Sequence, residues 1–183
     1  MRISLFILCI SFLIQSCSSP VAATQSKKEN SVYYSCNMEK ENYTDKTVIL
    51  KAEELRNCFL TNNDKIVWIS SYWQACPGQD INGQKQIYEK YKDKIDWVIL
   101  SETFDVKEVK TIEKTIEHSI YFIDPIYESS RLKNAKGYMK DLFKENASED
   151  VLNHTCIFVK NNKVIAVAYD DQLTDDFFKK FIQ

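Results

Sequence analysis

The chain has 183 residues, a length that fits one domain better than two, and its formal net charge is close to balanced at −2. Because 24 basic residues stand against 26 acidic ones, no excess of positive charge suggests a nucleic acid as partner. Hydrophobic residues make up 44% of the chain and aromatic residues 13%, which excludes a disordered protein and predicts a buried core.

The N-terminal residues have the pattern of an export signal. Arg2 precedes an apolar run from Ile3 to Ile14. This run is shorter than the roughly 20 residues that span a bilayer, so it suits the apolar part of a cleaved signal peptide. We therefore expect residues 1–16 to be a signal peptide.

The end of the apolar run resembles the lipobox of bacterial lipoproteins, in which a small residue precedes a cysteine that is lipidated. Here the sequence is Ile14-Gln15-Ser16-Cys17, in which Gln15 is an unusual occupant. The resemblance implies a lipid anchor on Cys17 that holds the protein to a bacterial membrane, facing the periplasm or the exterior. An ordinary cleaved signal peptide, with Cys17 as a bystander, is the alternative.

Residues 17–31 are small and polar and have no hydrophobic periodicity, which predicts a flexible tether. From residue 32 to 183, strand-like and helix-like patterns alternate. Strands are predicted at 32–34, 47–50, 66–70, 97–100, 120–123, 156–160 and 164–168, and helices at 52–61, 79–92, 106–117, 135–143 and after Thr174. The alternation predicts one domain with a largely parallel sheet, helices on both faces and a closing hairpin.

Three local signals refine this prediction. Asn82-Gly83 is a poor helix interior and is expected to kink the helix over 79–92. Asn161-Asn162-Lys163 is expected to form the turn of the C-terminal hairpin. His118, at the end of the helix over 106–117, is expected to be solvated or to complement the helix dipole.

The succession from Thr47 to Gln183 resembles the TlpA/redoxin branch of the thioredoxin-like superfamily. The resemblance is carried by Lys46-Thr47-Val48-Ile49-Leu50, by the apolar strand Ile66 to Trp73, by Ile120 to Pro125, which falls where that branch has an inserted strand, and by the hairpin over 160–164. It implies an α/β, thioredoxin-like three-layer fold with a central mixed sheet, helices on both faces and an N-terminal extension.

The sequence departs from this family at the redox centre. The family has Trp-Cys-x-x-Cys at the start of a helix, whereas this chain has Trp73-Gln74-Ala75-Cys76-Pro77. Gln74 takes the place of the nucleophilic cysteine and Pro77 that of the second one. Asn153-His154-Thr155 takes the place of the family's cis-proline. The usual two-cysteine chemistry is therefore excluded, and the expected active-site loop consists of Trp73, Gln74, Pro77, His154 and Thr155.

Cys76 remains a candidate catalytic residue, because a cysteine at a helix start has its thiolate stabilised by unpaired N–H groups and the helix dipole. The resemblance brings Cys156 near it. Cys156 would then be either a resolving cysteine or a small buried core residue, and we favour the core role. Cys36 and Cys58 are the candidates for a structural disulfide between the N-terminal extension and the first helix.

Two functions of different classes follow. The first is a divergent thiol–disulfide oxidoreductase of the cell envelope that acts through Cys76 on an exported protein or peptide. The alternative is a redox-inactive thioredoxin-like module that binds such a partner. A third hypothesis, a single-cysteine peroxidase, has less support. Those enzymes have a Pro-x-x-x-Thr-x-x-Cys frame, which Ser70, Ser71 and Cys76 do not reproduce. Without Cys-x-x-Cys or His-x-x-x-His spacing, neither a metal nor another cofactor is expected.

Overall fold

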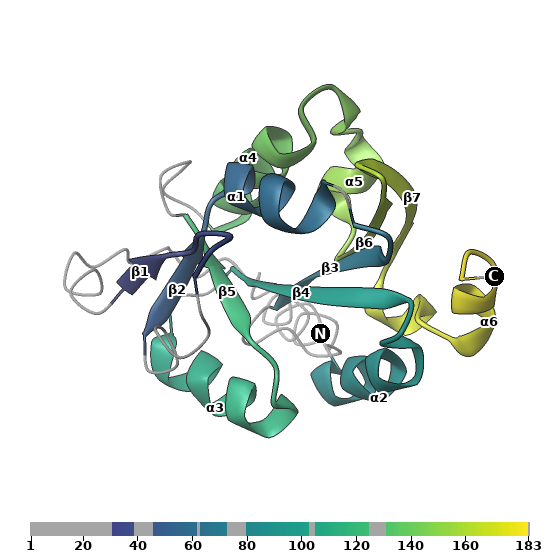
Figure 1. The fold of residues 1–183 in the computed structure, drawn as a ribbon, viewed down its shortest axis with the longest axis horizontal. Helices are drawn as coiled ribbons and strands as arrows, with labels where there is room; N and C mark the ends of the chain where they lie inside the picture. Colours follow the sequence, from purple (N-terminus) through teal and green to yellow (C-terminus); the bar gives the residue numbers. More distant parts are fainter. Residues whose placement is uncertain are drawn as a thin grey trace, which may run out of the picture.

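The computed structural model describes residues 31–38, 46–61, 63–72, 80–102, 105–124 and 131–182. Within these ranges one sheet has the strand order β1-β2-β5-β4-β3-β6-β7 (Figure 1). The strands are β1 Ser31–Tyr33, β2 Thr47–Leu50, β3 Ile66–Tyr72, β4 Ile95–Ser101, β5 Ile120–Ile123, β6 Cys156–Lys160 and β7 Lys163–Ala168. The helices are α1 Ala52–Leu55, η3 Arg56–Leu60, α2 Ile81–Tyr91, α3 Val106–Ile116, α4 Arg131–Phe143, η4 Lys144–Asn146, α5 Glu149–Asn153, η5 Asp170–Gln172 and α6 Asp175–Lys179.

The sheet is mixed, as predicted. Strands β1, β2, β5, β4 and β3 run parallel to one another, whereas β6 runs antiparallel to β3 and β7 antiparallel to β6. Helices α1, α4 and α5 lie on one face of the sheet, and α2, α3 and α6 lie on the other (Figure 1). This is a three-layer, thioredoxin-like α/β fold in which β1, from the N-terminal extension, forms one edge of the sheet.

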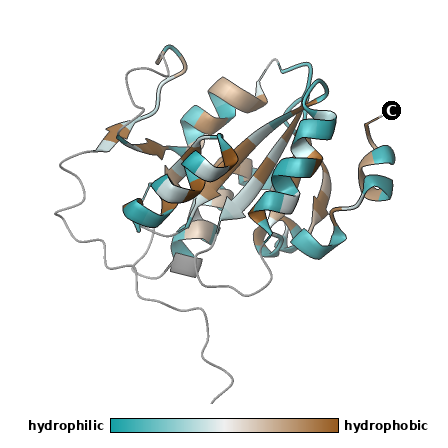
Figure 2. Cartoon of the chain, turned by 90° about the horizontal axis from the view of Figure 1, so that it is seen from below, coloured by the Kyte–Doolittle hydropathy of each residue, from teal (hydrophilic) through white to brown (hydrophobic). Residues whose placement is uncertain are grey.

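Two apolar cores fill the spaces between the layers. Along β3, Val67 and Ile69 belong to the core beneath α1 and α4, whereas Trp68 belongs to the core beneath α2, α3 and α6. Alternate side chains of a strand point to opposite faces, so β3 is buried on both sides. Figure 2 shows hydrophobic residues along the strands and hydrophilic ones on the outer sides of the helices.

The predicted kink at Asn82-Gly83 is wrong. Both residues lie in the first turn of α2, which runs unbroken from Ile81 to Tyr91. Asp80 caps this helix by accepting a 2.8 Å hydrogen bond from the Gly83 N–H. A Cβ atom on residue 83 would lie 2.4 Å from Asp80 Oδ2, so glycine here makes room for the capping side chain.

The helix predicted over 52–61 changes its hydrogen-bond pattern midway. After α1 it continues as η3, a π-helical turn that ends with Thr61 N–H donating to the carbonyl of Arg56 at 3.0 Å. The short helix α5 was not predicted. Its signal is Ser148, whose hydroxyl accepts from the Val151 N–H, followed by two acidic residues in the first turn.

The C-terminal hairpin and helix are confirmed. Asn161 and Asn162 have φ values of 51° and 63°, the left-handed conformation that a two-residue hairpin turn requires and that asparagine tolerates. Lys163 already belongs to β7. Thr174 caps α6, because its side chain accepts a hydrogen bond from the Phe177 N–H.

The expectation that His118 is solvated is wrong, whereas its interaction with the helix dipole stays a prediction. Its side chain is half-buried, and its ring stacks on Trp97 with the ring centroids 5.0 Å apart. Nε2 lies 2.7 Å from the backbone oxygen of Trp97 and donates to it. His118 therefore belongs to the packing beneath α2 rather than to the surface.

No helix in the described part of the chain has the length and apolar character needed to cross a membrane. The predicted signal peptide, the lipidation site at Cys17 and nearly all of the tether lie within residues 1–30, outside the described residues.

Candidate functional site

At β3 the chain passes from one face of the sheet to the other, as it does again at β5. The helix before β3 covers one face, and the helix after it covers the opposite face (Figure 1). In open α/β sheets, ligands bind in the crevice outside the carboxyl ends of the strands. The segment that leaves β3, residues 73–79, contains Trp73, Gln74, Cys76 and Pro77, and all of them lie outside the described residues.

The described members of the predicted site lie beside this end of β3. Strand β6 pairs with β3 so that Cys156 is opposite Ser70. One residue farther, the Ser71 N–H donates to the Thr155 carbonyl at 2.9 Å. Thr155 and Cys156 therefore lie beside the end of β3, with His154 next to them in the chain.

The end of β3 is held firmly by side chains of neighbouring elements. The indole N–H of Trp97 on β4 donates to the Ser70 hydroxyl at 2.8 Å, in the buried interior. The Tyr72 hydroxyl donates to Glu108 on α3 at 2.9 Å. Burial, reinforced by this carboxylate, raises the pKa of Tyr72 and keeps its hydroxyl a donor. A neighbouring strand and a helix therefore fix β3 just before the predicted active-site loop.

The Cys156 thiol lies in the core and is not exposed at all (0%). Its Sγ donates to Asp170 Oδ1 at 3.4 Å. Burial raises the pKa of this thiol far above its ordinary value, and the negative charge of Asp170 raises it further. Thiol exchange requires a thiolate, so the folded state holds Cys156 in an unreactive form. This supports the core role over the resolving role.

Asp170 is a part of the site that the sequence analysis missed. It follows β7, and its Oδ1 accepts from both the Thr155 hydroxyl, at 3.1 Å, and the Cys156 thiol. Burial raises the pKa of Asp170, and the charges of Asp171 and Asp80 add to this. The register of the C-terminal hairpin could have predicted the position of Asp170. Pairing of Cys156 with Ala168 brings residue 170 back beside residues 154–155.

His154 is held by two neighbours at the same edge. Its Nδ1 donates to the carbonyl of Asp150 in α5, and its ring stacks on Tyr169 with the centroids 4.5 Å apart. The side chain remains half-buried. These contacts orient the imidazole just before the start of β6.

A cavity of about 130 Å³ opens at this edge of the sheet. Its lining includes Ser71, Glu102, Lys136, Met139 and His154. A water molecule occupies about 30 Å³ in the liquid, so the cavity holds a few waters or one side chain. An acid, a base and an imidazole line it together with a thioether, which suits a small amphipathic group such as a peptide side chain.

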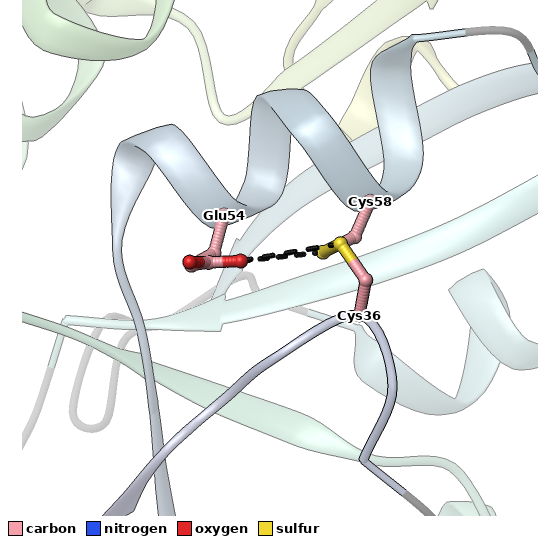
Figure 3. Close-up of side chains that lie close together, drawn as sticks. All are labelled: Cys36, Glu54 and Cys58. Carbon is pink, nitrogen blue, oxygen red and sulfur yellow. Dashed lines mark hydrogen bonds between the residues drawn. A yellow bond between two sulfur atoms is a disulfide. The ribbon is translucent and has the colours of Figure 1, made fainter.

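The other two cysteines of the described chain form a disulfide. Cys36, in the turn after β1, is bonded to Cys58 in η3, and their Cα atoms are 5.1 Å apart. The bond joins the N-terminal extension to the first helix. Glu54 of α1 lies against it, with Oε2 3.9 Å from Cys36 Sγ and 3.5 Å from Cys58 Sγ (Figure 3).

The buried thiol predicts that the protein loses stability in alkali. An ordinary thiol has a pKa of about 8.5, so Cys156 ionises in the unfolded chain in mild alkali, whereas the folded state keeps the thiol protonated. A group whose pKa is raised by folding stabilises the fold fully when the pH is below its pKa in the unfolded chain. This stabilisation is lost as the pH rises from that value towards the pKa in the folded state. We expect the free energy of unfolding to fall by about 1.4 kcal/mol per pH unit above pH 9 from this group alone. Denaturant titrations at pH 8 to 10.5 measure it.

The matched variant for this prediction is Cys156→Ala. Removing the thiol should make the alkaline slope shallower by that amount, while the slopes due to Tyr72 and other groups persist. Equal slopes for the two proteins between pH 9 and 10.5 would show that the Cys156 thiol ionises as easily in the folded state as in the unfolded chain.

Comparison with known proteins finds no relative of this chain. The chain matches no protein-family model, no curated protein and no solved structure.

Proposed function

We propose that the protein is a lipid-anchored, thioredoxin-like protein of a bacterial cell envelope that exchanges thiols and disulfides through Cys76. In this proposal residues 1–16 are a signal peptide, Cys17 carries the lipid and residues 17–31 tether the domain at residues 32–183. The partner is an exported protein or peptide that carries a disulfide.

The observation that carries this proposal is the position of β3. The strand ends at the carboxyl edge of the parallel strands and is fixed by Trp97 and Glu108, and the residues that follow it contain Cys76. Of the described cysteines, two are joined in a disulfide and the third is buried and protonated. Of the four cysteines in the domain expected at residues 32–183, Cys76 is therefore the one left to carry out thiol–disulfide exchange.

The proposed reaction needs one cysteine of this chain. The Cys76 thiolate attacks one sulfur of the partner disulfide, forming a mixed disulfide and releasing the other partner sulfur as a thiolate. A second thiol, from the partner or from a small thiol such as glutathione, then attacks the mixed disulfide. This regenerates Cys76 and leaves the second thiol in the new disulfide.

The test is the reactivity of Cys76 in the full chain in detergent. Alkylation followed across pH by mass spectrometry should give Cys76 a pKa below the ordinary thiol value of about 8.5. The Cys76→Ser variant should lose formation of the mixed disulfide with oxidised glutathione down to the uncatalysed background. A Cys76 pKa at or above the ordinary value would overturn the proposal.

A redox-inactive binding module is the second candidate, and the cavity beside His154 favours it. The cavity can take one side chain of an extended peptide, whereas Cys156 is too deeply buried to resolve a mixed disulfide. The same Cys76→Ser variant separates the two functions. Crosslinking to exported peptides that survives this substitution but is lost in Lys136→Glu, on the cavity wall, would favour binding.

A further inference from the structure

The Cys36–Cys58 disulfide and Glu54 form a cluster that the proposed exchange reaction does not use. Each of the three side chains offers one ligand atom, and these atoms lie within 4.8 Å of one another. Cys36 is exposed and the other two are half-buried, so the cluster is open to solvent. Figure 3 shows the carboxylate of Glu54 directed at the two sulfur atoms.

From this geometry we propose that reduction of the disulfide converts the cluster into a binding site for a thiophilic divalent cation, with Zn²⁺ as the type case. Cys36 and Cys58 supply two thiolates, Glu54 supplies one carboxylate oxygen, and water completes the coordination. Tetrahedral sites with sulfur, nitrogen and oxygen ligands are the usual environment of zinc in proteins.

The distances already fit such a site. Zinc bonds of about 2.3 Å to sulfur and 2.0–2.2 Å to oxygen place sulfur and oxygen about 3.5 Å apart in a tetrahedron. Oε2 of Glu54 lies 3.5 Å from one sulfur and 3.9 Å from the other. The two sulfurs need a separation of about 3.8 Å, which rotation of the reduced side chains provides because their Cα atoms are 5.1 Å apart.

The backbone around the cluster does not depend on the disulfide alone. Tyr34 and Phe59, which flank the two cysteines, have ring centroids 5.5 Å apart, and Tyr121 packs edge-on against both rings. The Tyr34 N–H also donates to the Ile49 carbonyl at 2.8 Å. These contacts keep the turn after β1 beside η3 when the covalent bond is open. The π-helical turn that carries Cys58 is a feature often found at functional sites.

The charges explain why the reduced cluster takes up a cation. In the disulfide neither sulfur carries a proton, so the contacts with Glu54 become hydrogen bonds only after reduction. In the reduced state two sulfurs crowd one carboxylate, and ionising both would gather three negative charges. Two protons or one divalent cation relieve this repulsion.

The proposed site forms by a two-electron reduction of the disulfide followed by metal binding. A dithiol, from an envelope thiol–disulfide protein, gives two electrons and two protons to the Cys36–Cys58 bond and becomes a disulfide itself. Zn²⁺ then displaces the two thiol protons into solvent, and Glu54 binds through its carboxylate. In the oxidised state no lone thiolate is present, so the disulfide keeps the site closed.

The experiment titrates Zn²⁺ into the full chain in detergent, with the disulfide intact and after reduction by a phosphine that is then removed. The other cysteines are present in both forms, so the difference isolates this cluster. The reduced chain should bind one more Zn²⁺ and release two protons with it. Isothermal titration in buffers of different ionisation enthalpy measures both quantities. Co²⁺ in place of Zn²⁺ should show sulfur-to-metal charge-transfer absorption.

The matched variants are Glu54→Gln and Glu53→Gln, which remove the same charge from neighbouring positions of α1 and leave both cysteines in place. Even second-shell partners contribute about 10- to 100-fold to metal affinity, so Glu54→Gln should weaken the additional site at least about 10-fold. Glu53 is exposed, and Glu53→Gln should change nothing. Equal affinity in the two variants, or no additional Zn²⁺ on reduction, would overturn the proposal whatever the outcome at Cys76.

Discussion

Replacing Phe178 with alanine is expected to lower the free energy of unfolding by about 3–5 kcal/mol. The ring has no exposed surface and sits among aromatic neighbours: Tyr91 at 5.2 Å, Phe158 at 5.4 Å and Trp68 at 5.7 Å between centroids. Its helix, Asp175–Lys179, has only five residues and is too short to be stable by itself. Loss of this ring therefore leaves a cavity and also loosens α6 from the sheet.

Denaturant unfolding followed by tryptophan fluorescence measures this loss, since Trp68 lies directly beneath the ring. Phe177→Ala is the matched control. Phe177 is half-buried in the same helix and contacts Phe158 at 5.4 Å, so its removal should cost less than half as much. Equal losses in the two variants would contradict the assignment of Phe178 as the residue that holds α6 in place.

Removing both cysteines of the disulfide, in Cys36→Ser/Cys58→Ser, is expected to lower the free energy of unfolding by about 3 kcal/mol. The two cysteines are separated by 22 residues, and closing a loop of that length removes about this much conformational freedom from the unfolded chain. The double variant is preferred to a single one because it leaves no unpaired thiol beside Glu54.

Equilibrium unfolding in urea gives this value directly. The natural control is the unaltered protein reduced by a dithiol without added metal, which should unfold with the same midpoint as the double variant. A loss below about 1 kcal/mol would mean that the N-terminal strand contributes little order to the folded state and that its covalent link is dispensable.

Much of the fold follows from local patterns in the sequence. The apolar run at β3 predicts a strand buried on both faces, because polar and apolar residues do not alternate along it and neither face is marked as the solvent side. The pair Asn161-Asn162 predicts the hairpin turn, since both residues adopt the left-handed conformation that it requires. Thr174 predicts the start of α6. These signals act over a few residues and need no knowledge of distant contacts.

The parts that sequence analysis missed depend on contacts between distant segments. Asp170 meets Thr155 and Cys156 only because the hairpin folds back, and His118 is half-buried because Trp97 lies beside it. Glu54 reaches the sulfurs because Cys36 comes from a turn outside the helix. No spacing motif records such a cluster, so a search for Cys-x-x-Cys or His-x-x-x-His patterns passes over it.

The place of β1 at the sheet edge has a mechanical consequence. Tension applied from the N-terminal side of the chain enters the described fold at Ser31, where the strand pairs in parallel with β2. Residues before Cys36 can peel away under load, releasing at most about 3.3–3.6 Å of length each. The covalent bond to Cys58 then passes the force to the first helix, so further extension requires that helix to unwind or the bond to be reduced.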